Sequence, residues 1–144
     1  MSVLSEKVRV ALFGEMNVSN VTTLATGGVW HMMAPPGTPR PYVVFNRQSS
    51  APVVRAFNNT DIVENDLWLI KVISDEDSST TKEPQALNAE ILNAIETAIG
   101  NELTLTGGGE VWNVERQNDM PEFTEIANDR LLYHSGFMLR VWSH

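Results

Sequence analysis

Residues 62–73 read IVENDLWLIKVI, and this stretch decides the predicted fold. Apolar side chains fill both alternating sets of positions around Trp68, with Leu67 and Leu69 on one side and Trp68 and Ile70 on the other. Alternation with period two is typical of a β-strand, and a strand that is apolar on both faces is covered on both sides or lies inside a sheet. The sequence therefore predicts a central strand from about Ile62 to Ile73.

Two helices are predicted, one before this strand in the chain and one after it. After the central strand, Pro84 suits a first helical turn, and apolar residues recur at helical spacing from Leu87 up to Gly100. Before it, residues 2–13 show a similar apolar stripe, and Gly14 is expected to end that helix in a left-handed conformation.

Four further strands are predicted around residues 29–33, 42–48, 110–116 and 131–142, from their apolar or alternating patterns. The order is then α-β-β-β-α-β-β. Consecutive strands favour an α+β fold with a mostly antiparallel, mixed sheet of about four to five strands and two main helices on one face. We expect a single domain over residues 1–144, because no linker or repeat is visible.

Composition narrows the functional classes. The 144 residues hold 10 Lys plus Arg against 18 Asp plus Glu, a formal net charge of -8, which argues against a protein that grips nucleic-acid phosphates. There is no cysteine, so disulfides, thiol nucleophiles and thiolate metal sites are excluded. No apolar run approaches the roughly 20 residues of a membrane span, and Glu6, Lys7 and Arg9 interrupt any signal-peptide core. We expect neither membrane insertion nor secretion by that route.

One glycine-rich segment and one acidic segment do not match the phosphate-binding and calcium-binding motifs that they partly resemble. Gly107, Gly108 and Gly109 precede a predicted strand rather than a helix, and no Lys-Ser or Lys-Thr pair follows, so a phosphate cradle is not expected. The acidic run from Asp75 to Asp77 resembles the start of a calcium loop, but Thr80 and Ala86 stand where such a loop needs Gly and Glu.

No catalytic constellation is visible either. His31, His134 and His144 do not have the spacing of a helical zinc motif, and no serine lies in a Gly-x-Ser-x-Gly elbow. His134 is expected to be a half-buried, hydrogen-bonding strand residue. We therefore predict that the chain is not an enzyme and has no cofactor and no metal site.

Two long connections, 49–61 and 117–130, are predicted as loops far longer than the usual hairpin connection of about 2 to 5 residues. Each contains apolar residues that a monomer would expose, or that would fold back as a lid over its own core. Two such loops together favour contact with other subunits. The candidate residues for an interface with other protein subunits are Val53, Val54, Arg55, Phe57, Met120, Phe123 and Ile126.

Residues 34–45, APPGTPRPYVVF, place a Pro-rich turn before an apolar strand. Here the chain resembles the small tail-completion and tail-terminator proteins of long-tailed bacteriophages. The likeness continues in order through DLWLIKVIS at 66–74, ALNAEILNAIETAI at 86–99, a Gly-rich segment before a strand, and LLYHSGFMLRVW at 131–142.

The resemblance implies a non-enzymatic virion protein, assembled in the host bacterial cytoplasm, that forms a ring at the head-proximal end of the tail. Such a ring, typically hexameric, ends polymerisation of the tail tube and joins the tail to the head connector. Its implied partners are further copies of itself, the tail tube protein and the connector protein. DNA would pass through the lumen without specific binding, and an acidic lining would oppose its adhesion. The alternatives are a monomeric module that binds a small ligand or peptide, and an unrecognised hydrolase.

Overall fold

The computed structural model describes residues 2–55 and 61–144, with only the backbone described at 52–55 and 61–62. Five strands form one sheet in the order β1-β2-β3-β5-β4, in which β1 runs parallel to β2 and the other neighbours are antiparallel. This confirms the predicted α+β class and the mixed, mostly antiparallel sheet. In chain order the elements are α1 (Val3–Met16), α2 (Ser19–Thr22), β1 (Val29–His31), β2 (Tyr42–Arg55), β3 (Asp61–Ser74), α3 (Pro84–Ile99), β4 (Val111–Ala127) and β5 (Arg130–Ser143).

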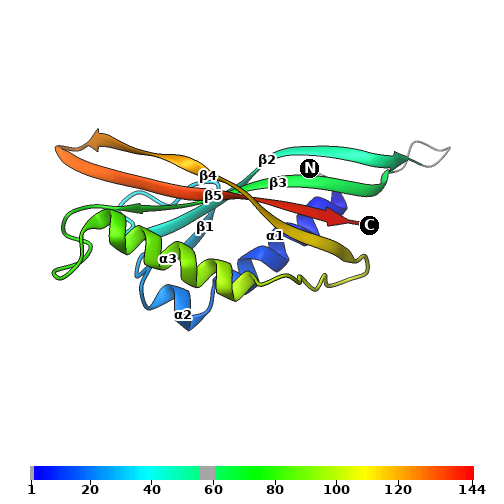
Figure 1. The fold of residues 1–144 in the computed structure, drawn as a ribbon, viewed down its shortest axis with the longest axis horizontal. Helices are drawn as coiled ribbons and strands as arrows, with labels where there is room; N and C mark the ends of the chain where they lie inside the picture. Colours follow the sequence, from blue (N-terminus) through cyan, green and yellow to red (C-terminus); the bar gives the residue numbers. More distant parts are fainter. Residues whose placement is uncertain (1, 56–60) are drawn as a thin grey trace.

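The helices lie on one side of the sheet, and the other side carries no helix in the part of the chain described here (Figure 1). The strands run along the long axis of the molecule. The hairpin formed by β4 and β5 turns at the left end in Figure 1, where α3 begins, while β2 and β3 extend together toward the right. The two strand pairs therefore reach toward opposite ends.

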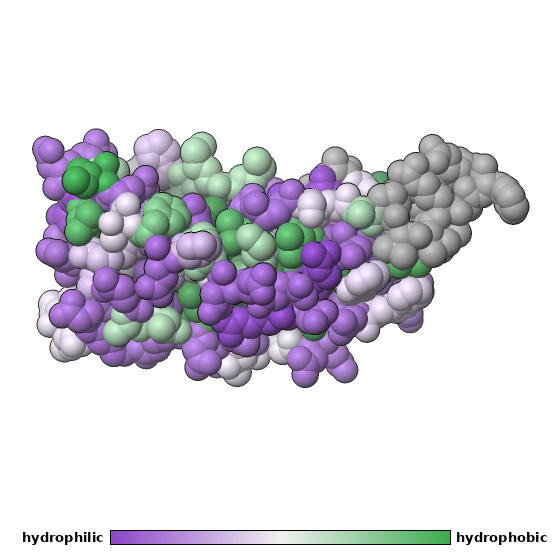
Figure 2. Space-filling model, turned by 45° about the horizontal axis from the view of Figure 1, so that its top comes forward, coloured by the Kyte–Doolittle hydropathy of each residue, from purple (hydrophilic) through white to green (hydrophobic). Residues whose placement is uncertain are grey.

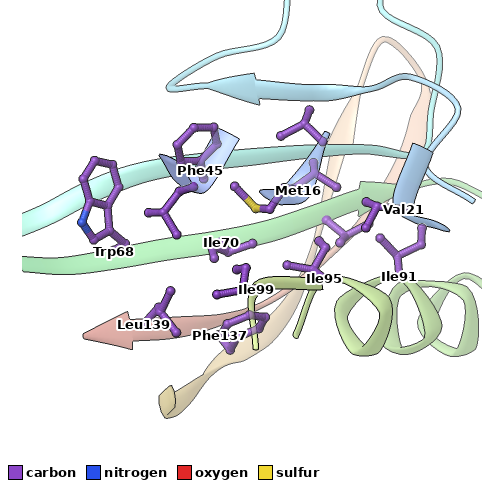
Figure 3. Close-up of a cluster of buried hydrophobic side chains, with 14 of the residues drawn as sticks. Met16, Val21, Phe45, Trp68, Ile70, Ile91, Ile95, Ile99, Phe137 and Leu139 are labelled. Atoms are coloured by element: carbon purple, nitrogen blue, oxygen red, sulfur yellow. The ribbon is translucent and has the colours of Figure 1, made fainter. Parts of the chain in front are cut away.

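The core lies between the helices and the sheet, and β3 is the middle strand as predicted. Trp68, Ile70 and Val72 point toward the helices and are fully buried. Phe45 on β2 and Phe137 on β5, also fully buried, flank them. Figure 3 shows Phe137 next to Ile99 of α3 and Phe45 near Trp68. The alternating residues Trp68, Ile70 and Val72 thus form the side of the central strand that the helices cover.

The first helix is longer than predicted. Its N-terminus is capped by Ser2, whose hydroxyl accepts a hydrogen bond from the Ser5 amide, but Gly14 lies inside the helix rather than ending it. The helix continues to Met16 and ends at Asn17. Met16 is fully buried in the core, so the additional residues gain apolar burial that outweighs the helix-breaking tendency of Gly14.

The second predicted helix is confirmed as α3. Pro84 occupies its first turn, Gly100 follows its last residue with a positive φ of 61°, and one face is buried from Leu87 to Ile99. The short helix α2 was not predicted, because four residues cannot show helical periodicity. It buries Val21 against the core beneath α3.

The prediction that 49–61 and 117–130 are long loops is wrong. Residues 49–55 continue β2, and residue 61 already belongs to β3. The other segment is a hairpin in which Ala127 pairs with Arg130, with Asn128 and Asp129 between them at φ of 52° and 63°. Asn and Asp tolerate this left-handed conformation and so allow a two-residue turn.

The strand character of residues 117–127 was concealed by their polarity. As the edge strand, β4 is exposed along most of its length and therefore needs few apolar residues. Pro121 would interrupt a regular ladder, and it falls in an irregular stretch between the paired residues Met120 and Phe123. A polar sequence with a proline can form this strand because β4 pairs with β5 on one side only, and its other edge forms no ladder within the described sheet.

Candidate functional site

The predicted interface residues divide between two strands. Met120, Phe123 and Ile126 lie in β4, where Phe123 is 45% and Ile126 79% exposed. Val53, Val54 and Arg55 belong to β2, but their side chains lie outside the described residues, as does Phe57 entirely. The role of all seven in an interface stays a prediction.

An exposed apolar pair marks the end of the β4–β5 hairpin. Ile126 is the register partner of Leu131, which is 38% exposed, so the two side chains share one face of the hairpin. A hydrophobic patch is visible at this end of the molecule, at the upper left of Figure 2. We call residues 122–131 the hairpin tip. Sequence reasoning found Ile126 but missed Leu131, which it assigned to a regular strand.

The other face of the hairpin is organised around His134. Its ring stacks on Phe123, with centroids 4.3 Å apart and planes at 11°, and its Nε2 lies 2.6 Å from Glu125 Oε1. His134 is nearly fully buried, more than the predicted half. Burial lowers its pKa below the ordinary 6.5, although the hydrogen bond that the ring donates to the Glu125 carboxylate acts in the opposite direction.

Acidification is expected to destabilise the protein through this histidine. A histidine whose pKa is lowered by folding binds its proton more readily when unfolded, so stability is highest above pH 6.5 and falls as pH drops toward the folded pKa. The loss can reach about 1.4 kcal/mol per pH unit for one proton. Denaturant unfolding of the native chain and of His134→Gln, from about pH 7.5 to 5, measures it.

His31 serves as the matched control, because burial lowers its pKa as well. In the His31→Gln variant, the free energy of unfolding should lose the part of its pH dependence that comes from His31 and keep the part that comes from His134. An unchanged pH slope in His134→Gln would show that this ring is not held neutral by the fold.

A cluster of charges fixes the hairpin tip to the body of the protein. Nη1 atoms of Arg40 and Arg130 lie 3.2 and 3.1 Å from Asp75 Oδ2, and Arg130 also pairs with Asp77. Burial raises the pKa of Asp75, but hydrogen bonds from Ser78 and Arg40 outweigh it and leave that pKa below its ordinary value. The residue after the turn is therefore tied to the loop that follows β3.

The sheet side opposite the helices forms a second surface, which we call the uncovered face. It contains half-buried Leu67, Leu69 and Met138, with Lys71 and Arg140 among them. Leu69 is paired with Met138, and Leu67 with Arg140, so these side chains form neighbouring rows. Figure 2 brings this side forward and shows hydrophobic patches between hydrophilic ones.

Further exposed apolar residues lie outside the predicted set. Met32 and Met33 follow β1, and Trp112 near the start of β4 is 58% exposed and packs on the His144 ring at 4.5 Å. On α1, the residues at helical spacing Val3 and Val10 are exposed. Met32 and Met33 could have been identified as exposed from the sequence, because they lie directly before the Pro-rich turn.

The glycine segment 107–109 is contacted by a lysine of the same chain. Lys7 Nζ donates hydrogen bonds to the carbonyl oxygens of Gly107 and Gly108 at 2.6 and 2.9 Å. Carbonyl oxygens turned toward a lysine do not form a phosphate cradle, which needs N–H groups.

A groove of about 410 Å³ lies between α3 and β4. Arg116 bridges Glu96 and Asp119 at its wall. Among residues 2–55 and 61–144, no three His, Asp or Glu side chains are arranged to hold a metal ion. The described helices are too short or too polar to cross a membrane.

Comparisons with known proteins give matches of structure. No family model and no curated protein matches the sequence. A chain in the virion of a native gene transfer agent particle has the same fold, with a TM-score of 0.58 and 14% identity over 99% of both chains. A second solved protein, whose name states no function, gives a TM-score of 0.53 at 12% identity over 97% of this chain and 96% of that one. The chain therefore shares its whole fold with a component of a virion.

Proposed function

We propose that this chain is a structural protein of a virion that forms a ring at the head-proximal end of the tail tube. The ring ends tube polymerisation and joins the tail to the head connector. The observation that carries the proposal is the fold that this chain shares with a virion chain over 99% of each. Because fold alone does not determine function, the sequence resemblance to tail-terminator proteins supplies the particular role.

The surfaces of the molecule support self-assembly. A ring of identical subunits needs two different patches on each copy, one for each neighbour. The hairpin tip and the uncovered face both present apolar side chains, and they lie on different parts of the molecule. A hexamer, with the tail tube protein and the connector protein as partners, is the assembly that we propose.

The net charge of -8 fits a ring through which DNA passes. A channel lined by carboxylates would repel phosphates and let the DNA slide without adhering. No catalytic role and no cofactor is part of the proposal.

Tail tube assembly in vitro tests this function. Tube protein is polymerised with and without the chain, and the tubes are examined by negative-stain electron microscopy. We expect a ring at one end of each tube and shorter tubes as the chain is added. A monomer that never binds a tube end would contradict the proposal and favour the ligand- or peptide-binding module.

A matched pair of variants sharpens the test. Ile126→Asp places one negative charge on the exposed hairpin tip, whereas Asn101→Asp adds the same charge just after α3. If the tip is an assembly contact, the first variant caps tubes poorly and the second caps them as the native chain does.

A further inference from the structure

The sheet has an open strand edge on each side. On one side, β1 pairs with β2 at residues 43–45 only, and β2 then continues to Arg55 beside β3 alone among the described strands. On the other side, β4 pairs with β5 and with no other described strand. The N–H and C=O groups along an open edge can pair with a further strand, so natural proteins either block such an edge or use it.

Irregular pairing and proline confine each open edge to a short regular stretch. On β2, pairing with β3 is regular at residues 49–51, between a register shift at Gln48 and residue 52, a proline that has no N–H to donate. On β4, pairing with β5 is regular at residues 113–116 and irregular from there to Phe123. The side chains at 49–51 are exposed, as are those of Asn113, Glu115 and Arg116.

The two open stretches lie at the same level of the sheet. Two rows of paired residues cross it from one open edge to the other, Ser49–Leu67–Arg140–Glu115 and Ala51–Asn65–Trp142–Asn113. The strands β2 and β4 run in opposite directions, because three antiparallel pairings separate them. A second copy that is rotated about an axis along the strands therefore brings its residues 49–51 beside 113–116 of the first, in the antiparallel direction.

We propose that residues 113–116 of β4 pair with residues 49–51 of β2 from a second copy, so that the sheets of neighbouring copies become continuous. We call this contact the edge joint. Its occupant is a second copy because the chain itself carries both halves of the pairing, at one level and in opposite directions. The contact joins two different edges, so it is head-to-tail and can be repeated around a ring. This inference rests on the proposed function and names the contact through which the ring forms.

The side chains that meet at the edge joint allow the pairing. On the uncovered face, Ser49 of one copy lies beside Glu115 of the other, and a serine hydroxyl can donate a hydrogen bond to a carboxylate. On the helix side, Arg47 lies at the level of Arg116. Arg116 is paired with two carboxylates of its own copy, and Arg47 donates to a hydroxyl of α1. Each guanidinium is thus bound within its own copy, which reduces the repulsion between them.

Disulfide cross-linking tests the edge joint, because the native chain has no cysteine. The variant with Ser49→Cys and Glu115→Cys carries one thiol on each edge, and paired strands hold such Cβ atoms about 4.5–5.5 Å apart. Within one copy, three strand spacings separate the two positions, about 14 Å, which a disulfide cannot span. The variant is oxidised mildly with tail tubes present and run on a non-reducing gel. We expect a ladder of covalent oligomers.

A mismatched pair controls for chance collisions. Thr124 is also exposed on β4, but its partner Tyr133 is seven residues from Arg140, about 23 Å along the strands. Ser49→Cys with Thr124→Cys should therefore give at least about tenfold less cross-linked oligomer than the matched pair, because its sulfur atoms do not meet.

The second row of the sheet repeats the matched test. Ala51→Cys with Asn113→Cys should give the same ladder, and it replaces the first pair if that variant does not fold. Circular dichroism and thermal melting before oxidation establish that each variant is folded.

The outcomes separate the edge joint from the proposed function. A ladder from a matched pair, with little from the mismatched pair, supports the joint. No ladder from either folded matched pair, or equal ladders from matched and mismatched pairs, would overturn it. A chain that caps tail tubes without a ladder would overturn the joint and leave the proposed function standing. A ladder from a chain that never caps a tube would support the joint and contradict the function.

Discussion

The Trp68→Ala substitution is expected to lower the free energy of unfolding by about 3–5 kcal/mol. Trp68 is fully buried at the centre of the middle strand, with the Phe45 ring 6.1 Å away and the His31 ring 6.4 Å away. Removing the indole leaves a large cavity between β3 and the helices. Denaturant unfolding followed by circular dichroism measures the loss.

Trp112 offers a matched control, since it is the same residue type at 58% exposure. Trp112→Ala removes the same atoms from a site that is already in contact with water. We expect a change of less than about 1 kcal/mol. Similar losses at the two positions would mean that β3 is not the centre of the core.

Gly136→Ala is expected to destabilise the protein by about 1–3 kcal/mol. A Cβ on Gly136 would lie 2.5 Å from the Ile70 carbonyl oxygen and 2.9 Å from Lys71 Cβ. The first of these is backbone of the central strand, which cannot move aside without disturbing the ladder between β3 and β5. Thermal and denaturant unfolding of the variant measure the effect.

The control for this position is Gly14, in the interior of α1. A Cβ there would meet no atom within 4 Å. Gly14→Ala should therefore stabilise the protein by about 0.5–1 kcal/mol, through the higher helix propensity of alanine. If Gly136→Ala also stabilised the chain, the close packing of β5 on β3 would be contradicted.

The parts of the fold that sequence predicts are those with strong periodicity. The central strand alternates on both faces, and α3 has a proline in its first turn, an apolar stripe and a glycine after its end. Each signal arises from residues that are buried together. The class of fold and the strand order along the chain follow from these two elements and their neighbours.

The hairpin shows why the rest could not be predicted. β4 is an exposed edge strand with irregular pairing, so its sequence carries neither alternation nor a continuous apolar run. Its turn depends on Asn128 and Asp129. Asn and Asp are common both in tight turns and in longer loops, so they do not distinguish a hairpin from a loop. Ile126 was identified from its apolarity, but its cross-strand partner Leu131 is visible only once the register is known.

The uncovered face was missed for a different reason. Leu67, Leu69 and Met138 alternate with core residues, so the sequence indicates a strand that is apolar on both sides without telling whether anything covers the second side. Only the placement of the helices on one side shows that this face remains open.

The position of this chain in intact particles tests the proposed role at the head-proximal end of the tail. Particles are purified from cells that carry its gene, labelled with gold-conjugated antibody against the chain, and imaged by electron microscopy. We expect one cluster of label per particle, at the junction of head and tail. Label spread along the whole tube, or particles that lack the chain altogether, would contradict it.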